Sequence, residues 1–222
     1  MPDSNRSSTS STAWRSDQRT VHVVDDDDLV RGALTGLLRS IDLKVEAFAS
    51  VEDFLAAPRA PGPSCLVLDV RLRGQSGLTF QKSLVDRGQP HIPIVFMTGH
   101  GDIAMTVKAM KAGAIDFLTK PFRDQDMIEA VMAALDRDAK RLEAEQATGA
   151  LRHCWESLTA REREVLHHVA AGLMNKQIAA EMGVAEITAK IHRGQAMRKM
   201  NARSVAELVR MMQVLDPAPG MQ

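Results

Sequence analysis

Short apolar runs rich in β-branched residues alternate with stretches of helical spacing over the first 145 of the 222 residues, and this alternation limits the fold more than any other feature. Strands that alternate with helices form a parallel sheet with helices on both faces. The apolar runs lie at 21–24, 45–48, 65–70, 92–98 and 115–119, and the helical stretches at roughly 28–40, 51–57, 77–87, 103–112 and 124–145. We therefore predict an α/β domain with a five-stranded parallel sheet.

The strand pattern stops at Leu158, and the rest of the chain predicts four short helices. Two segments, 159–162 and 204–207, have the Ser/Thr-x-x-Glu spacing of a capping box, which marks the start of a helix. Gly172 is expected to end the first helix and Asn175 to cap the second. Gly183 predicts a tight turn before a third helix at about 186–199. The C-terminal part is therefore predicted to be a compact all-α domain.

These patterns divide the chain into four parts: a polar, Ser-rich disordered tail (1–18), the α/β domain (19–126), a charged and Ala-rich helical linker (127–155) with a plausible break at Gly149, and the all-α domain (156–216). The whole chain is formally neutral, but its halves are not. Residues 19–138 carry a net charge of −3 and residues 152–212 carry +4. Such asymmetry is expected when only the basic half binds a polyanion.

Cys65 and Cys154 are the only cysteines, and they show neither metal-ligand spacing nor a disulfide framework, which indicates a reducing compartment. The N-terminus has no charged segment followed by an apolar one, as a signal peptide would. No apolar run approaches the ~18 residues that span a bilayer. We therefore expect a soluble, cytoplasmic protein that does not bind membranes.

Polar side chains fall at the predicted carboxyl ends of the strands, where open parallel sheets bind their ligands. Asp25 and Asp26 follow the first strand, Asp69 ends the third, Thr98 the fourth and Lys120 the fifth. Each residue alone fits a bland interpretation, such as a solvated turn, a helix cap or a surface lysine. Their joint occurrence at strand ends, in this order, instead indicates one shared crevice.

Clustered carboxylates repel one another unless a cation joins them, and hard oxygen ligands suit Mg²⁺, which often accompanies phosphate. A carboxylate can attack a phosphoryl group to give an aspartyl phosphate. Mg²⁺ and the ammonium of Lys120 would neutralise charge on the transferring phosphoryl oxygens. Thr98 offers a hydroxyl that could donate a hydrogen bond to the phosphoryl group once it is attached.

The same residues carry a family resemblance that spans roughly residues 20–125. The segments that carry it are Val23–Asp26, Leu68–Arg71, Ser76–Gly77, Met97–Asp102, Ala109–Ala114 and Asp116–Phe122. They resemble the receiver domain of FixJ-type response regulators. The resemblance implies a flavodoxin-like sheet with the strand order 2-1-3-4-5.

The resemblance also implies the roles of individual residues. Asp69 would be the phosphoacceptor, Asp26 a direct Mg²⁺ ligand and Asp25 an assisting one. Asp69 and the backbone carbonyl of Arg71 would complete the protein ligands, and the Lys120–Pro121 bond would be cis. Thr98 and Phe117 would form the conformational switch.

One position departs from the family. Receiver domains of this type usually have proline two residues after the equivalent of Arg71, whereas this chain has Arg73. Loss of the proline loosens the loop beside the acceptor, and the arginine adds a cation near it. We expect this change to affect the lifetime of the phosphoryl group rather than the chemistry.

The third predicted helix of the all-α domain has two distinct faces. At ~100° per residue, one arc carries Ala189, His192, Arg193, Ala196 and Met200, and the opposite arc carries Ile187, Ile191, Gly194 and Arg198, flanked by Lys190 and Gln195. The spacing of Ala179, Gly183 and Ala189 fits a helix-turn-helix but is also found in ordinary helical hairpins. An isoleucine at the centre of a basic face fits a solvated helix poorly. It fits the major groove, where it can contact a thymine methyl group.

Three segments, Leu158–Glu162, Gly172–Ala179 and Thr188–Arg193, resemble the LuxR-type helix-turn-helix. The resemblance implies that Asn175, Lys176 and Thr188 contact phosphates, and that Lys190 and Ile191 meet base edges. Arg198 would contact bases or phosphates. The family usually has larger aliphatic residues where this chain has Ala189 and Ala196, so we expect a thinly packed core.

We therefore predict a transcriptional response regulator, not an enzyme. Its expected partners are a sensor histidine kinase, double-stranded promoter DNA, RNA polymerase and, after phosphorylation, a second copy of the chain. Two alternatives remain open at this point. A Mg²⁺-dependent phosphohydrolase would use Asp69 as its nucleophile, although many such enzymes have a second aspartate where this chain has Arg71. The other alternative is a ligand-sensing or phosphorylation-independent DNA-binding protein, although the acidic pocket offers an organic ligand few apolar walls.

Overall fold

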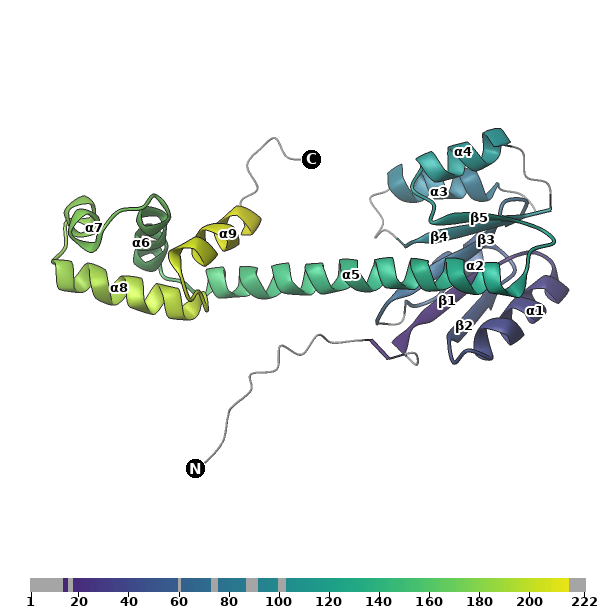
Figure 1. Cartoon of the computed structure of the whole chain (residues 1–222), viewed down its shortest axis with the longest axis horizontal. Helices are drawn as coiled ribbons and strands as arrows, with labels where there is room; N and C mark the ends of the chain where they lie inside the picture. The colour runs from purple at the N-terminus through teal and green to yellow at the C-terminus, as the bar shows by residue number, and fades with distance from the viewer. Residues whose placement is uncertain are drawn as a thin grey trace, which may run out of the picture. The chain divides into compact units, whose positions relative to one another are not determined.

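The computed structural model describes residues 14–15, 18–59, 61–72, 76–86, 92–99 and 103–215. The chain divides into two compact units, Met1–Leu142 and Glu143–Gln222 (Figure 1). Most of the predicted tail at 1–18 lies outside the described residues, and so does Arg73. Within the described part of the chain, no helix has the length and apolar character needed to cross a membrane.

The first unit contains a five-stranded sheet in the order β2-β1-β3-β4-β5, and every neighbouring pair is parallel. This confirms the predicted order. The strands are β1 (Thr20–Val24), β2 (Lys44–Phe48), β3 (Ser64–Asp69), β4 (Ile94–Thr98) and β5 (Asp116–Thr119). Because all five strands point the same way, their carboxyl ends meet at one edge of the sheet.

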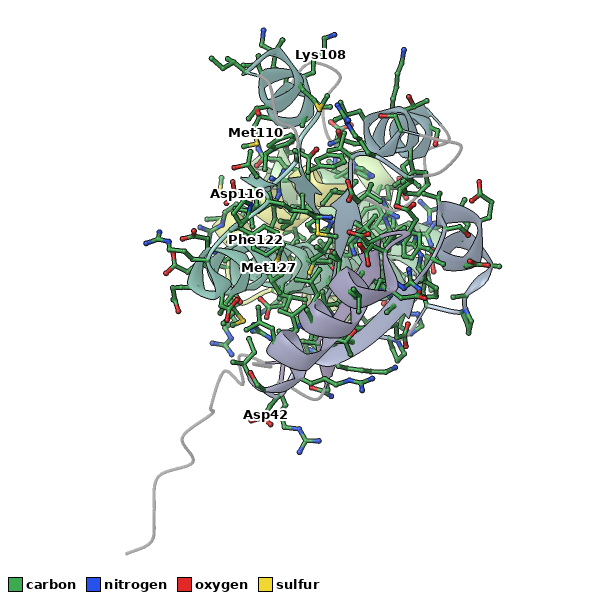
Figure 2. All side chains as sticks on the ribbon, turned by 90° about the vertical axis from the view of Figure 1, so that its right-hand side faces the viewer. Asp42, Lys108, Met110, Asp116, Phe122 and Met127 are labelled. Atoms are coloured by element: carbon green, nitrogen blue, oxygen red, sulfur yellow. The ribbon has the colours of Figure 1, made fainter. Side chains whose placement is uncertain are left out.

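Helices cover both faces of this sheet. The helices of the unit are α1 (Asp28–Arg39), α2 (Val51–Ala56), α3 (Gly77–Asp86), α4 (Ile103–Lys111) and α5 (Asp124–Glu156). Residues of α1 and α5, such as Leu38 and Val131, form one apolar cluster with the sheet. Residues of α2, α3 and α4, such as Phe54, Phe80 and Ala109, form the other. Figure 2 shows α4 and α5 on opposite sides of the sheet.

The central strand β3 explains the apolar run in the sequence. Residues 65–68 are all fully buried, because helices pack on both faces of the sheet. Burial of each such side chain contributes roughly 1.5–3 kcal/mol to the free energy of unfolding. The strand therefore holds its last residue, Asp69, in a fixed place at the edge of the sheet.

Helix α5 is one continuous helix of 33 residues, so the break predicted at Gly149 is wrong. A glycine inside a helix costs only about 1 kcal/mol relative to alanine, and the helix-forming residues around Gly149 outweigh that cost. The beginning of α5 packs in the core of the first unit through Met127, Val131 and Leu135. Its end packs in the core of the second unit through side chains such as Trp155.

The second unit has four further helices, as predicted: α6 (Ala160–Ala170), α7 (Asn175–Met182), α8 (Glu186–Lys199) and α9 (Val205–Leu215). Leu166, Ile178, Met200 and Leu208 are the large side chains at the centre of its core. Ala189 and Ala196 of α8 are also fully packed into this cluster. Small side chains at these two positions therefore form the inner face of α8.

The helix ends follow the sequence signals with two exceptions. The predicted capping box at 204–207 is only half formed, because Ser204 accepts from the backbone of Glu207 but the Glu207 side chain accepts from the backbone of Arg203. Thr159 and Glu162 form the predicted capping box at the start of α6. Gly172 and Gly183 have positive φ angles of 84° and 65°, which favour glycine in the turns before α7 and α8. Asn175 does not cap α7, because the N-cap position is Met174 and the Asn175 side chain accepts a hydrogen bond from Arg193 instead.

Two glycines of the second unit should respond in opposite ways to substitution by alanine. In Gly194→Ala the new Cβ would meet only the tip of the Arg198 side chain, at 3.5 Å. We expect the free energy of unfolding of this unit to rise by about 1 kcal/mol, because alanine favours the helical state. Gly183→Ala should lower it by roughly 1–2 kcal/mol, because the left-handed backbone strains an L-residue.

Urea unfolding followed by the fluorescence of Trp155, in a Trp14→Phe background, measures both effects in the intact chain. Equal changes of the same sign in the two variants would contradict this account of the turn and the helix.

Candidate functional sites

The polar residues predicted to converge at the strand ends do so. A cleft of about 560 Å³ lies at this edge of the sheet, and its lining residues are Asp25–Asp28, Asp69, Arg71, Gly99 and Lys120. Thr98 ends β4 and is fully buried, next to the cleft residue Gly99. Phe117 lies in β5, half-buried, with its ring 6.2 Å from that of Phe96. The Lys120–Pro121 bond is cis, as the resemblance implied.

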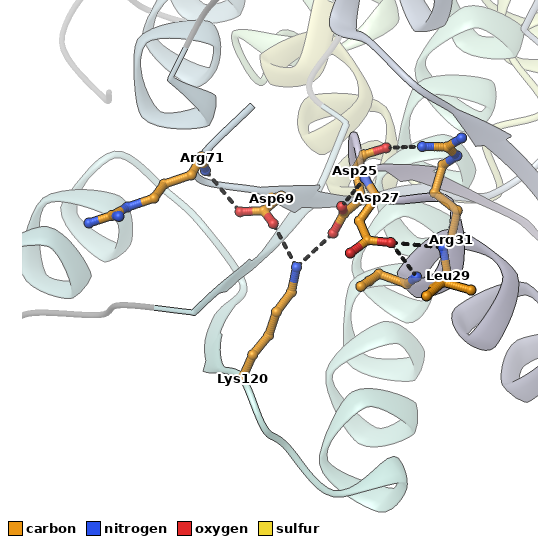
Figure 3. A network of polar contacts seen from close by, with 8 residues as sticks. Asp25, Asp27, Leu29, Arg31, Asp69, Arg71 and Lys120 are labelled. Carbon is orange, nitrogen blue, oxygen red and sulfur yellow. Dashed lines mark hydrogen bonds and ion pairs between the residues drawn. The ribbon is translucent and has the colours of Figure 1, made fainter. Parts of the chain in front are cut away.

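The ammonium of Lys120 joins two carboxylates at the centre of this cleft (Figure 3). Its Nζ donates hydrogen bonds to Oδ2 of Asp25 at 2.7 Å and to Oδ2 of Asp69 at 2.6 Å. The side chains of Asp25 and Asp69 are only 1% and 10% exposed. Two nearly buried carboxylates therefore share one cation, and this contact ties the ends of β1 and β3 to the segment after β5.

Burial raises the pKa of the Asp25 carboxyl above its ordinary value, although hydrogen bonds from Lys120 and from the Asp27 backbone oppose the shift. For Lys120, burial alone would lower the pKa of the ammonium. The hydrogen bonds to Asp25 and Asp69 outweigh that effect together, so the pKa of Lys120 lies above its ordinary value. The lysine is therefore charged at neutral pH, as a partner for a phosphoryl group must be.

A short series of hydrogen bonds orders the acidic loop after β1. Oδ1 of Asp25 accepts from the backbone N–H of Asp27 at 2.8 Å, and Asp27 caps α1 by accepting from the backbone of Leu29 at 2.8 Å. Arg31 donates to the backbone carbonyl of Asp25 at 2.6 Å (Figure 3). It also forms an ion pair with Asp28. Asp26, the predicted direct metal ligand, is half-buried in this loop.

Asp69 is held on its other side by the backbone. Its Oδ1 accepts a hydrogen bond from the N–H of Arg71 at 2.8 Å. The first residue of α3, Gly77, lies so close to the end of β3 that a Cβ there would be 2.6 Å from the carbonyl oxygen of Asp69. Only glycine fits this approach without a shift of the backbone, so α3 begins directly against the predicted acceptor.

The donor set of the cleft fits a hard divalent cation in chemistry, although not as a preformed cage. Among the described residues, no three His, Cys, Asp or Glu side chains are arranged around a common metal position. Lys120 instead takes one oxygen from each of Asp25 and Asp69. The cleft still holds more carboxylates than cations, and carboxylate oxygen is the ligand type that Mg²⁺ prefers.

The second candidate site is the outer face of α8. The predicted inner arc is confirmed at Ala189, Ala196 and Met200, which are buried. On the outer arc, Ile187 is 63% exposed and Ile191 is 51% exposed. The predicted DNA-contacting residues Lys190 and Arg198 are exposed on the same helix, Lys176 is exposed in the first turn of α7, and Thr188 is half-buried.

Two polar contacts that the sequence did not predict hold α8 in place. Arg193 donates to Oδ1 of Asn175 at 2.9 Å and so links α8 to the start of α7. Lys199 donates to Oε2 of Glu162 at 2.7 Å, which links the end of α8 to the capping box of α6. Burial alone would raise the pKa of Glu162, but the hydrogen bonds from Lys199 and Thr159 hold it below its ordinary value.

An Asp-rich cleft on a parallel sheet, together with a helix-turn-helix, defines a response regulator.

Comparison with known families agrees with this class. Residues 21–132 match the response regulator receiver domain, and residues 156–212 match the luxR family of bacterial regulatory proteins. The chain belongs to the FixJ/NarL-type two-component response regulators, a family of DNA-binding transcriptional regulators rather than enzymes. The alternative of a phosphohydrolase is therefore wrong. Receiver domains of this family generally bind Mg²⁺.

Three relatives span almost the whole chain. Nodulation protein W of Bradyrhizobium diazoefficiens is 55% identical over 195 residues, 88% of this chain and 86% of that protein. The transcriptional regulatory protein FixJ of Azorhizobium caulinodans is 44% identical and covers 90% of this chain and 94% of its own. The solved structure of the response regulator StyR has a TM-score of 0.80 at 48% identity, covering 88% of this chain and 98% of its own.

Removing the charge of Asp25 should stabilise the first unit at neutral pH. Since burial raises the folded-state pKa of Asp25, the ionised carboxylate lowers the free energy of unfolding at a pH above that value. This destabilisation disappears below the pKa of an aspartate in the unfolded chain, about 3.9. The carboxyl group is then protonated in the folded and in the unfolded state. Asp25→Asn should therefore be more stable than wild type at pH 7, and the difference should shrink as the pH falls towards 4.

Urea unfolding in the presence of a chelator, with amide hydrogen exchange in β1 as the signal of the first unit, measures the difference across this pH range. Asp42→Asn, which changes an exposed carboxyl group, is the matched control and should alter stability little. An Asp25→Asn variant that is less stable than wild type at pH 7 would show that ionised Asp25 stabilises the fold.

Proposed function

We propose that this protein is a transcription regulator that is switched on by phosphorylation of Asp69. The observation that carries the proposal is the place of the Asp69 carboxylate, at a strand end in an acidic cleft, beside the ammonium of Lys120. A sensor histidine kinase would be the phosphoryl donor. A carboxylate oxygen of Asp69 would attack phosphorus, the bond from phosphorus to the histidine nitrogen would break, and that nitrogen would keep the electron pair.

The residues of the cleft divide the work of this transfer. Asp26 would hold Mg²⁺ directly, with Asp25 assisting and with Asp69 and the backbone carbonyl of Arg71 as further ligands. When bound, the ion would supply positive charge opposite the phosphoryl oxygens. Lys120 already contacts Oδ2 of Asp69, so its ammonium would exchange a carboxylate partner for a phosphoryl oxygen without a long movement.

A rearrangement beyond the cleft would carry the signal. We propose that the hydroxyl of Thr98 donates to the new phosphoryl group and that Phe117 then changes its packing next to Phe96. Pro121 fixes the segment that follows Lys120. The face built from α4, β5 and α5 would reorganise and bind a second copy of the chain, which light scattering before and after phosphorylation would detect.

The second unit would then bind promoter DNA as part of a dimer. Asn175, Lys176 and Thr188 would contact phosphates, Lys190 and Ile191 would contact base edges, and Arg198 would contact either.

We retain the division predicted from the sequence, with a tail (1–18), a receiver domain (19–126), a linker (127–155) and a DNA-binding domain (156–216). The first turns of that linker pack in the core of the receiver. The bound dimer would act on RNA polymerase, and the protein would work in the cytoplasm, where its DNA target would lie.

The first test concerns the phosphoacceptor. Incubation with a small phosphodonor should add one acid-labile phosphoryl group to the wild-type chain, and only when Mg²⁺ is present. Asp69→Ala should gain none, because the nucleophile is gone, and Asp26→Ala should lose most of the dependence on Mg²⁺. Intact-mass measurement gives the stoichiometry. Modification of Asp69→Ala at the wild-type level would assign the acceptor to another residue, and no modification of the wild type would favour a phosphorylation-independent DNA-binding protein.

The second test concerns the phosphate contacts of the DNA-binding domain. Lys176 is exposed at the start of α7, and a phosphate contact adds affinity for any DNA sequence. Lys176→Ala should weaken specific and non-specific binding alike and lower the slope of log affinity against log salt by about one unit. Lys140→Ala removes the same charge from an exposed site on α5 and is the control. Equal salt slopes for the two variants would remove Lys176 from the interface.

A further inference from the structure

Two exposed isoleucines lie one turn apart on the outer face of α8. Ile187 is 63% exposed and Ile191 is 51% exposed, whereas Ala189, between them in sequence, is 1% exposed. Residues four apart share one face of a helix, so the two side chains form a single apolar strip. The first of them, Ile187, has no role among the contacts proposed above.

The surroundings of this strip indicate what covers it. Lys190 lies between the two isoleucines in sequence and is exposed, as are Arg198 on the same helix and Lys176 on α7. Helix α8 has one acidic residue, Glu186, against four basic ones, Lys190, Arg193, Arg198 and Lys199, so its net charge is positive. The occupant of the strip must therefore be anionic at its rim and offer apolar groups at its centre.

The major groove of DNA meets both requirements. Phosphates line its rim, and the 5-methyl groups of thymines are the apolar groups on its floor. A protein surface would offer apolar side chains but not a flanking row of negative charges at regular spacing. The basic residues around the strip thus favour DNA over a second protein.

We propose that Ile187 is a second base-reading residue, and that Ile187 and Ile191 together select two thymine methyl groups in each half-site. This inference rests on the proposed function, because it assumes that the outer face of α8 enters the major groove. It goes further by assigning a chemical identity to the bases that are read. Hydrogen-bonding residues on this face would add to the selection but would not replace it.

The geometry of the two helices limits the distance between these thymines. Residues four apart in an α-helix are separated by about 6 Å along its axis, at 1.5 Å per residue. Successive base pairs of DNA are about 3.4 Å apart. The two methyl groups should therefore lie within about two base-pair steps of each other, on either strand.

The test removes single methyl groups from the DNA. The phosphorylated full-length chain first selects duplexes from a randomised library, and each thymine of the selected site is then replaced by uracil, which lacks only the 5-methyl group. We expect wild type to lose about fourfold in affinity at each of two nearby positions, the equivalent of one buried methyl group each. Ile187→Ala should lose the sensitivity to uracil at one position and keep it at the other, and Ile191→Ala should show the reverse.

A matched control and the failing outcomes make the result decisive. Val214→Ala removes an equally exposed aliphatic side chain, 49% exposed on α9, and should keep both sensitivities. If Ile187→Ala keeps both, or loses both together although circular dichroism shows it folded, then Ile187 does not read a methyl group and the inference is wrong. If the library yields no selected sequence at all, the proposed function fails rather than this inference.

Discussion

The ammonium of Lys120, held between the carboxylates of Asp25 and Asp69, is the contact on which the first unit depends. These three residues lie at or just after the ends of β1, β3 and β5. Two like charges could not lie this close in a buried place without the cation. Removal of Lys120 would leave both buried carboxylates uncompensated, which is strongly destabilising. A group that replaces Asp69 as the partner of Lys120 must therefore carry negative charge of its own.

In the second unit, α8 exposes a polar outer face, while its inner face packs against the other helices of the unit. The inner face of α8 has small side chains, Ala189 and Ala196, so packing alone offers it little apolar area. Charged contacts at the middle and at the end of the helix add to that packing: Arg193 binds Asn175, and Lys199 binds Glu162. The outer face of α8 takes no part in these packing and polar contacts, so its side chains are available for a ligand.

The sequence predicted the sheet and the polar residues at its edge because apolar periodicity and strand ends are local signals, whereas the strand order came from the family resemblance. It also predicted the two faces of α8, since helical geometry needs only residue spacing. It failed at three residues, for three different reasons. Asn175 looked like a helix cap, but Arg193, 18 residues away, takes its oxygen. Gly149 looked like a break, but favourable neighbours carry the helix through it, and Arg31 was missed because its partner is a backbone carbonyl.

The bond between Arg193 and Asn175 makes the start of α7 chemically one-sided. Since the amide oxygen of Asn175 is engaged, the group left to meet an outside molecule is its NH₂, which can only donate hydrogen bonds. Phosphate oxygens can only accept them, so the start of α7 suits a polyanion in the direction of its hydrogen bonds as well as in its charge. A metal cation or an ammonium group would have to share an oxygen that already accepts from the positively charged Arg193, so this side chain disfavours cations.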